Sequence, residues 1–484
     1  MTRTYTWKRI GWRGSWALVM AALLLFSSLT LSAGGRVGAM QTPPDEAERA
    51  RDEEQADRDR QPSERDDTAP EANRSGRDND AATDGGNRGG QPVIVTLAPG
   101  ADAAAVAREL GVTPDFVYDD AINGFAATLP AQAVDALQRS RSAIQITPDL
   151  PVEAHIQDDA VQDEGRRRDR RRQRQTLPTG INRIDADTSD LAEINRGGAL
   201  ADVDVAVLDS GIVGHPDLNI AGGTSCRPEP GFRDRYGHGT HIAGTIGARD
   251  NKRGVVGVAP GARMWGVKVL NDRGSGNFSN VICGLEWVLE TQGTADAIDV
   301  VNMSLSGDGP ESTCVTDAFH EAVCNVVAAG VTVVVSAGND QEDASSQVPA
   351  NFDEVITVSA MTDFNGRPGG RAAPTCLRNA SDDTFARGYS NFGADVDFVA
   401  PGSCIRSTWT DKEYHVLTGT SMAAPHVAGA AAAYIAKNPN ATPVQVRAWL
   451  EDDASRPQRD REVGLKRDFD PDRIPERILY LGNT

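Results

Sequence analysis

The chain has a deficit of basic side chains. Its 484 residues carry 49 Lys and Arg against 69 Asp and Glu, a formal net charge of −20. Recognition of nucleic acid needs lysines and arginines clustered on one basic face, so this balance argues against DNA or RNA as a partner. The hydrophobic content of 39% is nevertheless sufficient for a sizeable core, and the length allows two or three domains.

Long apolar runs are absent beyond residue 31, so no later stretch is expected to span a membrane. Before that point, basic residues precede an apolar run from Trp16 to Leu31, and Leu31-Ser32-Ala33 is typical of a signal peptidase site. We predict a secretory signal peptide over residues 1–33 and no stable membrane insertion after its removal. An uncleaved anchor is the alternative, disfavoured because the run is short for a span of about 20 residues.

Cysteine is absent from the first 225 residues. The six cysteines that follow fit an exported domain in which they can be oxidised, and six allow about 15 pairings. Cys314 and Cys324 are close enough in sequence to close a small loop, although reduced, buried thiols are an alternative. No cysteine lies beside a histidine-bearing motif, so a catalytic cysteine is not expected.

Residues 34–90 are almost free of large apolar side chains and cannot bury enough surface to offset the entropy of ordering. We predict a disordered linker there. From residue 91 the pattern changes to a β-α-β-β-α-β order, the split βαβ (ferredoxin-like) layout of a small α+β domain over residues 91–157. The predicted elements are 93–97, 102–110, 116–118, 124–129, 131–139 and 143–146.

A second linker, 158–174, contains the arginine-rich run 166–174. A block of like charge repels itself and stays extended, as a cleavable processing linker requires. A solvated linker with no processing role is an equal alternative.

Residues 175–484 alternate apolar, β-branched runs with helical stretches. The predicted strands are 203–208, 264–269, 300–303, 331–336 and 355–358, and helices are predicted over 280–290 and 316–329. Strands unbroken by charge are typical of a parallel sheet buried on both faces. The expected fold is therefore α/β, with three layers around a central parallel sheet and the chemistry at the carboxyl ends of its strands.

Three residues lie beside glycines, where a tight backbone turn leaves a side chain accessible: Asp209, His238 and Ser421. A serine becomes a nucleophile when an imidazole takes its proton and a carboxylate orients that imidazole. Taken alone, each has a plainer explanation. Asp209 could be a turn residue, His238 a metal ligand paired with His241, and Ser421 a helix N-cap. No further set of metal ligands accompanies the two histidines. The segments are Val207-Leu208-Asp209-Ser210-Gly211, Gly237-His238-Gly239-Thr240-His241 and Gly419-Thr420-Ser421-Met422-Ala423-Ala424-Pro425.

In the order Asp, His, Ser these segments resemble the subtilisin-like serine peptidases (subtilases). The resemblance covers residues 91–484 and implies an endopeptidase that forms an acyl-enzyme without a catalytic cofactor. It also implies that Asn339, in Ser336-Ala337-Gly338-Asn339, donates to the oxyanion together with the Ser421 backbone N–H. Asn339 as a turn residue is the alternative.

The resemblance extends to a substrate groove in which an extended peptide is held by main-chain hydrogen bonds. Ser306 stands where the family usually has glycine and is expected to narrow the pocket rim. Asp340 adds negative charge nearby, and together they suggest a preference for a basic or small residue before the cut. The groove residues are Gly274, Ser275, Gly276, Ser304, Leu305, Ser306, Gly307, Ala337 and Gly338.

A structural calcium site is also implied, because the stretch 244–260 matches the length of the subtilisin loop that wraps this ion. Its expected ligands are the side chains of Gln175, Asp217 and Asn251 with loop carbonyls, since calcium takes six to eight oxygens. The carbonyl positions are Arg249, Arg253 and Val255. A polar surface loop is the alternative. Similar exported subtilases further suggest the disulfides Cys226–Cys283 and Cys376–Cys404.

Residues 91–157 resemble the subtilase inhibitory propeptide, most clearly at Asn123-Gly124-Phe125-Ala126; a generic α+β domain is the alternative. The prediction is thus a secreted, monomeric zymogen whose partners are protein or peptide substrates and its own propeptide as intramolecular inhibitor. An inactive exported subtilase-like binding protein is the second hypothesis. It is disfavoured because Asp209, His238, Ser421 and Asn339 are all present.

Overall fold

The computed structural model describes residues 90–139, 142–154, 174–195, 201–457, 471–472, 474, 476–482 and 484. The predicted signal peptide lies outside these residues, as do nearly all of the linkers 34–90 and 158–174. Within the described ranges, no helix combines the length and apolar character needed to cross a bilayer.

The N-terminal domain has the predicted β-α-β-β-α-β order, with the sheet order β2-β3-β1-β4. Alternate residues of β1, such as Val95, pack with Phe125 and Leu137 in a separate apolar cluster. Strand β1 begins three residues earlier than the predicted strand 93–97, because Gly90, Gln91 and Pro92 pair with Pro130, Leu129 and Thr128. The elements are β1 (Gly90–Leu97), α1 (Ala103–Glu109), β2 (Phe116–Tyr118), β3 (Gly124–Pro130), α2 (Ala131–Arg139) and β4 (Ala143–Pro148).

A large, mainly parallel sheet forms the centre of the C-terminal domain, in the order β19-β20-β16-β14-β12-β10-β6-β8-β7. Only the pairings of β19 with β20 and of β15 with β14 are antiparallel among its described strands. All five predicted strands are present in it. Its strands are β6 (Asp204–Asp209), β7 (Asn219–Ser225), β8 (Arg263–Lys268), β10 (Val300–Met303), β12 (Thr332–Ser336), β14 (Ile356–Thr362), β15 (Thr384–Phe385), β16 (Phe398–Pro401), β19 (Ser455–Pro457) and β20 (Arg477–Leu479).

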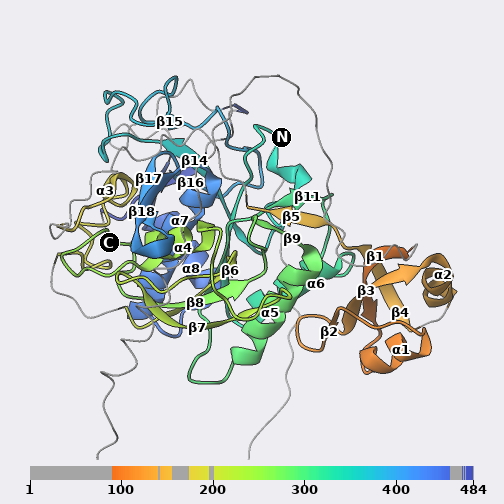
Figure 1. The fold of residues 1–484 in the computed structure, drawn as a ribbon. Coiled ribbons are helices and arrows are strands. Elements are labelled where there is room, and N and C mark those ends of the chain that lie inside the picture. The colour runs from red at the N-terminus through yellow and green to blue at the C-terminus, as the bar shows by residue number, and fades with distance from the viewer. Residues whose placement is uncertain are drawn as a thin grey trace, which may run out of the picture. The chain divides into compact units, whose positions relative to one another are not determined.

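Helices cover both faces of this sheet, which confirms the three-layer α/β architecture (Figure 1). Because successive strand residues point to opposite faces, Val205 and Val207 join one apolar cluster while Ala206 and Leu208 join the other. The first cluster includes residues of α4 (His238–Gly247), α7 (Thr420–Lys437) and α8 (Pro443–Asp452), and the second includes residues of α5 (Phe278–Thr291) and α6 (Ala318–Ala328).

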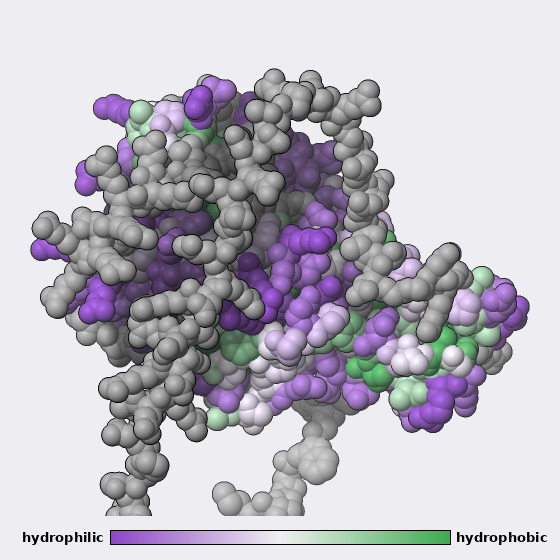
Figure 2. All heavy atoms as spheres, in the orientation of Figure 1, coloured by the Kyte–Doolittle hydropathy of each residue, from purple (hydrophilic) through white to green (hydrophobic). Residues whose placement is uncertain are grey.

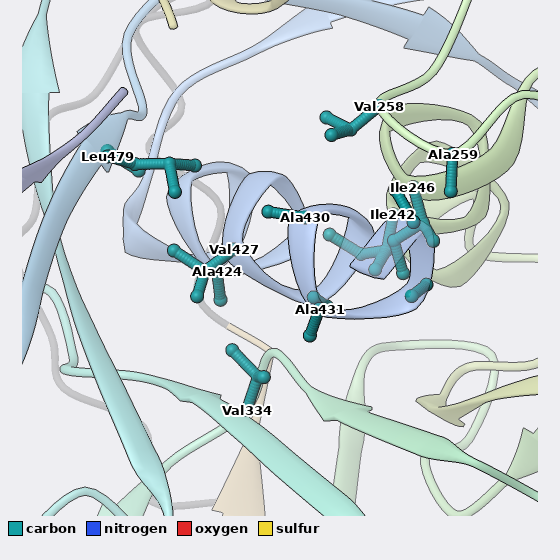
Figure 3. Close-up of a cluster of buried hydrophobic side chains, with 14 of the residues drawn as sticks. Ile242, Ile246, Val258, Ala259, Val334, Ala424, Val427, Ala430, Ala431 and Leu479 are labelled. Atoms are coloured by element: carbon teal, nitrogen blue, oxygen red, sulfur yellow. The ribbon is translucent and has the colours of Figure 1, made fainter. Parts of the chain in front are cut away.

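Helix α7 runs through the first cluster and is rich in alanine. Ala430 and Ala431 lie on this helix, near Ile242 of α4 and Val334 of β12 (Figure 3). Small side chains permit this approach, since a Cβ added at Gly429 would come within 2.6 Å of Val258 Cβ. The first turn of α7 lies beside Ser304, just after β10, and α4 begins beside Asp209 at the end of the neighbouring parallel strand β6. Both N-termini therefore lie at the same edge of the sheet.

Short elements complete the description. They are β5 (Pro151–Glu153), α3 (Thr179–Arg183), β9 (Ser275–Asn277), β11 (Gly307–Asp308), η1 (Ala344–Ser346), β13 (Gln347–Val348), β17 (Ile405–Thr408), η2 (Thr410–Lys412) and β18 (Tyr414–Leu417). Hydrophilic residues cover most of the described surface visible in Figure 2, in keeping with the acidic composition.

Three disulfides join the six cysteines: Cys226–Cys283, Cys314–Cys324 and Cys376–Cys404. The pairing expected from the short spacing of Cys314 and Cys324 is confirmed, as are the two implied by the resemblance. Cys226–Cys283 attaches the segment after β7 to helix α5.

Candidate active site

Asp209 and His238 form a buried pair at the carboxyl end of β6. Asp209 is the last residue of this strand, and His238 is the first residue of α4. The His238 Nδ1 lies 2.8 Å from Asp209 Oδ2 and 3.0 Å from Oδ1, and neither side chain is exposed. The pair therefore lies where a parallel α/β sheet places its chemistry.

This pairing determines which ring nitrogen of His238 carries the proton. An ionised carboxylate only accepts hydrogen bonds, so Nδ1–H donates to Asp209 and the lone pair is on Nε2. Within the described part of the chain, the buried Nε2 has no hydrogen-bond partner. The arrangement leaves a basic nitrogen available to take a proton.

Asp234 supports the Asp209–His238 pair through hydrogen bonds to their neighbours. The sequence analysis did not identify this residue. Its Oδ1 accepts a hydrogen bond from the Ser210 hydroxyl at 2.9 Å, and its Oδ2 accepts from the Thr240 N–H at 2.9 Å. The Ser210 N–H in turn donates to Asp209 Oδ1 at 2.6 Å. A helix N-terminus leaves backbone N–H groups without intrahelical partners. The signal in the sequence that could have identified Asp234 is an acidic residue four positions before the first residue of α4.

Ser421 lies in the first turn of α7. Its Oγ donates to Ser304 O at 3.4 Å, and the Ser304 hydroxyl donates to Ser421 O at 3.0 Å. His238 opens the neighbouring helix α4, which packs directly on α7. The two side chains form no hydrogen bond with each other in the described structure. Such bonds often form only when a reacting group is in place.

Asn339 lies just after β12 and is held beside the start of α7. Its Oδ1 accepts from the Thr420 N–H at 2.9 Å, and the Thr420 hydroxyl donates to Gly338 O at 3.2 Å. Because the amide oxygen is used in this way, the donating end of Asn339 is Nδ2. The hydrogen bond from Thr420 thus holds the side-chain amide of Asn339 beside the residue that precedes Ser421. The next residue, Asp340, is exposed.

The end of the N-terminal domain lies along one predicted wall of the substrate groove. Strand β5 pairs antiparallel with β9, and Val152 lies opposite Gly276 (Figure 1). The Ala154 N–H donates to Gly274 O at 2.9 Å. Val152 and Ala154 are buried, with exposed fractions of 0% and 7%. This tail is held by the backbone pairing that an extended peptide substrate would use.

The second predicted wall contacts the same tail from the other side. Ser306 accepts a hydrogen bond from the Glu153 N–H at 2.9 Å and donates its own N–H to Glu153 O at 3.1 Å. Leu305 is buried in the same apolar cluster as Val152. Gly307 is so close that an added Cβ would lie 2.4 Å from Pro151 O. The tail therefore occupies the space between both walls.

Further contacts of the N-terminal domain involve carboxylates that the sequence analysis missed. Glu286 of α5 accepts hydrogen bonds from the backbone N–H groups of residues 119–121, at 2.6–2.9 Å. Asp149 accepts from the Ser279 N–H at 2.9 Å and from its hydroxyl at 2.7 Å. Burial raises the pKa of Asp149, so this contact is more sensitive to acid than an exposed aspartate would be.

His241, the alternative metal ligand, is fully buried and bonded to the main chain. Its Nε2 lies 2.9 Å from Ile405 O and 3.2 Å from His415 O, so this nitrogen carries the proton and donates. Burial lowers the pKa of His241 to about 3. The residue is consequently neutral and linked to the backbone of strands β17 and β18.

The predicted calcium ligands are brought together in a hydrogen-bonded loop. Gln175 Oε1 accepts from the N–H groups of Asn251 and Lys252, at 2.9 and 2.5 Å. Asp217 Oδ1 accepts from Asn251 Nδ2 at 3.0 Å, and its Oδ2 accepts from Val255 N–H at 3.1 Å. Asp217 is buried, and its Oδ2 also accepts a hydrogen bond from the Tyr414 hydroxyl at 2.7 Å. The carboxylate of Asp217 and the amide oxygen of Gln175 are of the kind that calcium takes, and here both accept hydrogen bonds from the loop and its surroundings.

Comparisons with known proteins identify the two domains. A family model described as "Subtilase family" matches residues 201–467, and one described as "Peptidase inhibitor I9" matches residues 94–155. The "Alkaline protease" of Alkalihalobacillus alcalophilus is 37% identical over 329 residues, which cover 68% of this chain and 75% of that protein. "Subtilisin Savinase" of Lederbergia lenta is 41% identical over 282 residues, which cover 58% of this chain and 92% of that protein.

The fold and these matches define a serine protease made with an inhibitor-type propeptide. More specifically, the chain belongs to the subtilase family.

Proposed function

We propose that this protein is a secreted serine endopeptidase, made as a zymogen, that cuts proteins and peptides through Asp209, His238 and Ser421. The observation that carries the proposal is the buried hydrogen bond from His238 Nδ1 to Asp209, which leaves Nε2 as the proton acceptor. The predicted N-terminal signal sequence and the three disulfides support export.

In the proposed mechanism, His238 Nε2 takes the hydroxyl proton of Ser421 while Ser421 Oγ attacks the peptide carbonyl. Asp209 holds the required tautomer and stabilises the imidazolium. Asn339 Nδ2 and the Ser421 backbone N–H donate to the oxyanion. His238 then protonates the leaving amine, and the same imidazole activates the water that hydrolyses the acyl-enzyme.

Before processing, the tail 151–154 occupies the groove and acts as an intramolecular inhibitor. The support for this role is its pairing with Gly274, Gly276 and Ser306, the residues predicted to hold substrate. After removal of the tail, the same main-chain groups would be available to a substrate strand.

The test labels the processed protein with a fluorophosphonate, which reacts with activated serines. We expect the label on Ser421 and a matching loss of casein digestion. Casein digestion that continues after complete modification of Ser421 would contradict the mechanism. Casein binding with neither labelling nor cleavage would instead support the second hypothesis, an inactive binding protein.

We also propose a structural calcium ion at the loop 249–255, held by Gln175, Asp217 and Asn251 with the carbonyls of Arg249, Arg253 and Val255. The support is the assembly of these residues around the buried carboxylate of Asp217. The ion would supply a cross-link between the segment that begins at Gln175 and this loop.

Chelation by EGTA is expected to lower the melting temperature of the processed enzyme, and excess calcium to restore it. A calcium concentration 100 times the dissociation constant would add about 2.7 kcal/mol of stability. Asp217→Asn should remove the part of the shift that this site contributes, whereas Asp452→Asn, at an exposed position, should retain the full shift. A full shift in Asp217→Asn would contradict this site.

A further inference from the structure

Three aspartates lie together beside the antiparallel strand pair β14–β15 (Figure 1). Asp363 directly follows β14, and Asp382 and Asp383 directly precede β15. Because Thr362 pairs with Thr384, the next step of the same register brings Asp363 opposite Asp383. One carboxylate oxygen of each aspartate lies within 4.8 Å of the others, and all three residues are buried. The strand pair thus collects three carboxylates at one point.

Backbone N–H groups of the connecting loop hold these carboxylates in place. Asp382 accepts three hydrogen bonds from N–H groups of the loop 364–372, at 2.8–2.9 Å. Asp363 Oδ1 and Asp383 Oδ2 each accept one more from this loop, at 2.5 and 2.6 Å. A carboxylate has about four lone-pair sites, so these hydrogen bonds leave acceptor positions on every member of the cluster.

One oxygen of the cluster has no donor. Within the described residues, the buried Asp363 Oδ2 has no hydrogen-bond partner. Arg183 Nε lies 3.7 Å from this oxygen, which is too far for a hydrogen bond, and donates instead to Asp383 Oδ1 at 2.8 Å. An oxygen that is buried without a partner carries the full cost of its desolvation. This observation is independent of the clustering and indicates a ligand that is bound at Asp363.

The charges of the cluster point to the kind of ligand. Arg183, fully buried on α3, places one positive charge beside three carboxylates. If all three are ionised, an excess of two negative charges remains in the protein interior, where charges are normally paired or bound to a metal. Burial raises the pKa of Asp363 to about 7, which reflects the cost of this excess. A divalent cation would balance it.

We propose that Asp363, Asp382 and Asp383 bind a structural calcium ion, separate from the one proposed at the loop 249–255. Oxygens that share one calcium ion, at about 2.3–2.6 Å each, lie no more than about 5 Å apart, and the three carboxylates meet this limit. Oxygen ligands favour a hard cation. Magnesium fits less well than calcium, because it retains several waters and the cluster is enclosed. The ion would fasten the loop 364–372 to the strand pair β14–β15.

The experiment counts the calcium ions that the purified full-length Ser421→Ala chain binds, since this background excludes proteolysis during the measurement. Equilibrium dialysis gives the number of ions per chain, and the melting temperature with and without calcium gives their effect on stability. We expect Asp217→Asn to lose one ion and to keep a calcium-dependent rise in melting temperature. Adding Asp363→Asn should remove one more ion and the remaining rise. Asp452→Asn, which removes an equal charge at an exposed position, is the matched control and should keep both ions.

An Asp217→Asn chain that binds no calcium would overturn the inference, and this outcome requires no change in the cluster itself. A folded double variant that still binds the ion would overturn it as well, because the ion would then lie elsewhere. The two calcium proposals fail in different ways. Calcium that is lost on Asp363→Asn alone, and not on Asp217→Asn, would support the present site and contradict the one at the loop 249–255.

Discussion

Ser421→Ala is expected to lower proteolysis by a factor of about one million, the size of the loss known for the nucleophile of subtilisin itself. Without the hydroxyl, His238 has no proton to accept and no acyl-enzyme forms. Because the tail 151–154 lies in the groove, the same change should stop self-cleavage, and the uncut precursor should accumulate. The measurements are the precursor band over time and the rate of casein digestion.

Ser381→Ala is the matched control, since Ser381 is exposed and belongs to none of the site's hydrogen bonds described above. It should process and digest casein as the parent does. A Ser421→Ala protein that matures at the parental rate would contradict the assignment of the nucleophile.

Asp209→Asn is expected to slow self-cleavage by about 10⁴-fold, or about 5 kcal/mol in the barrier. An asparagine amide can donate to His238 Nδ1, which favours the tautomer with its proton on Nε2 and removes the base. The packing should be nearly unchanged, because the two side chains have the same shape. The rate of precursor cleavage measures the effect directly, without a separate substrate.

Asp452→Asn removes an equal charge from an exposed position on α8, and its precursor should cleave within a few-fold of the parental rate. Loss of folding would invalidate the comparison, so the melting temperature of Asp209→Asn must stay near that of the parent. A folded Asp209→Asn protein that cleaves at the parental rate would contradict the proposed role of Asp209.

The strands around the site were predictable because their residues are apolar, β-branched and uninterrupted by charge. The motif around Asp209 was predictable for a related reason: a polar residue directly follows a buried run and therefore lies at the strand's carboxyl end. Local spacing was also sufficient for Cys314 with Cys324. The other two disulfides were available only from the resemblance.

Asp234 and Glu286 were not predicted, although both accept several hydrogen bonds. An acidic residue in sequence resembles any solvated one until its partners are known. The donors to Glu286 lie more than 160 positions away, so no local pattern could connect them. The loop 249–255 illustrates the same limit, because the sequence analysis singled out its residues but not the hydrogen bonds that join Gln175 and Asp217 to it.

The class of fold, the order of the two domains and the residue types available for acid, base and nucleophile chemistry follow from the amino-acid sequence, since hydrophobic period and short motifs are local properties. The tautomer of His238, the hydrogen bond from Ser210 to Asp234 and the register of the tail against Ser306 follow only from the folded arrangement. Those features depend on distances between atoms that are remote along the chain. Only the packing of helices and strands around a common core sets such distances.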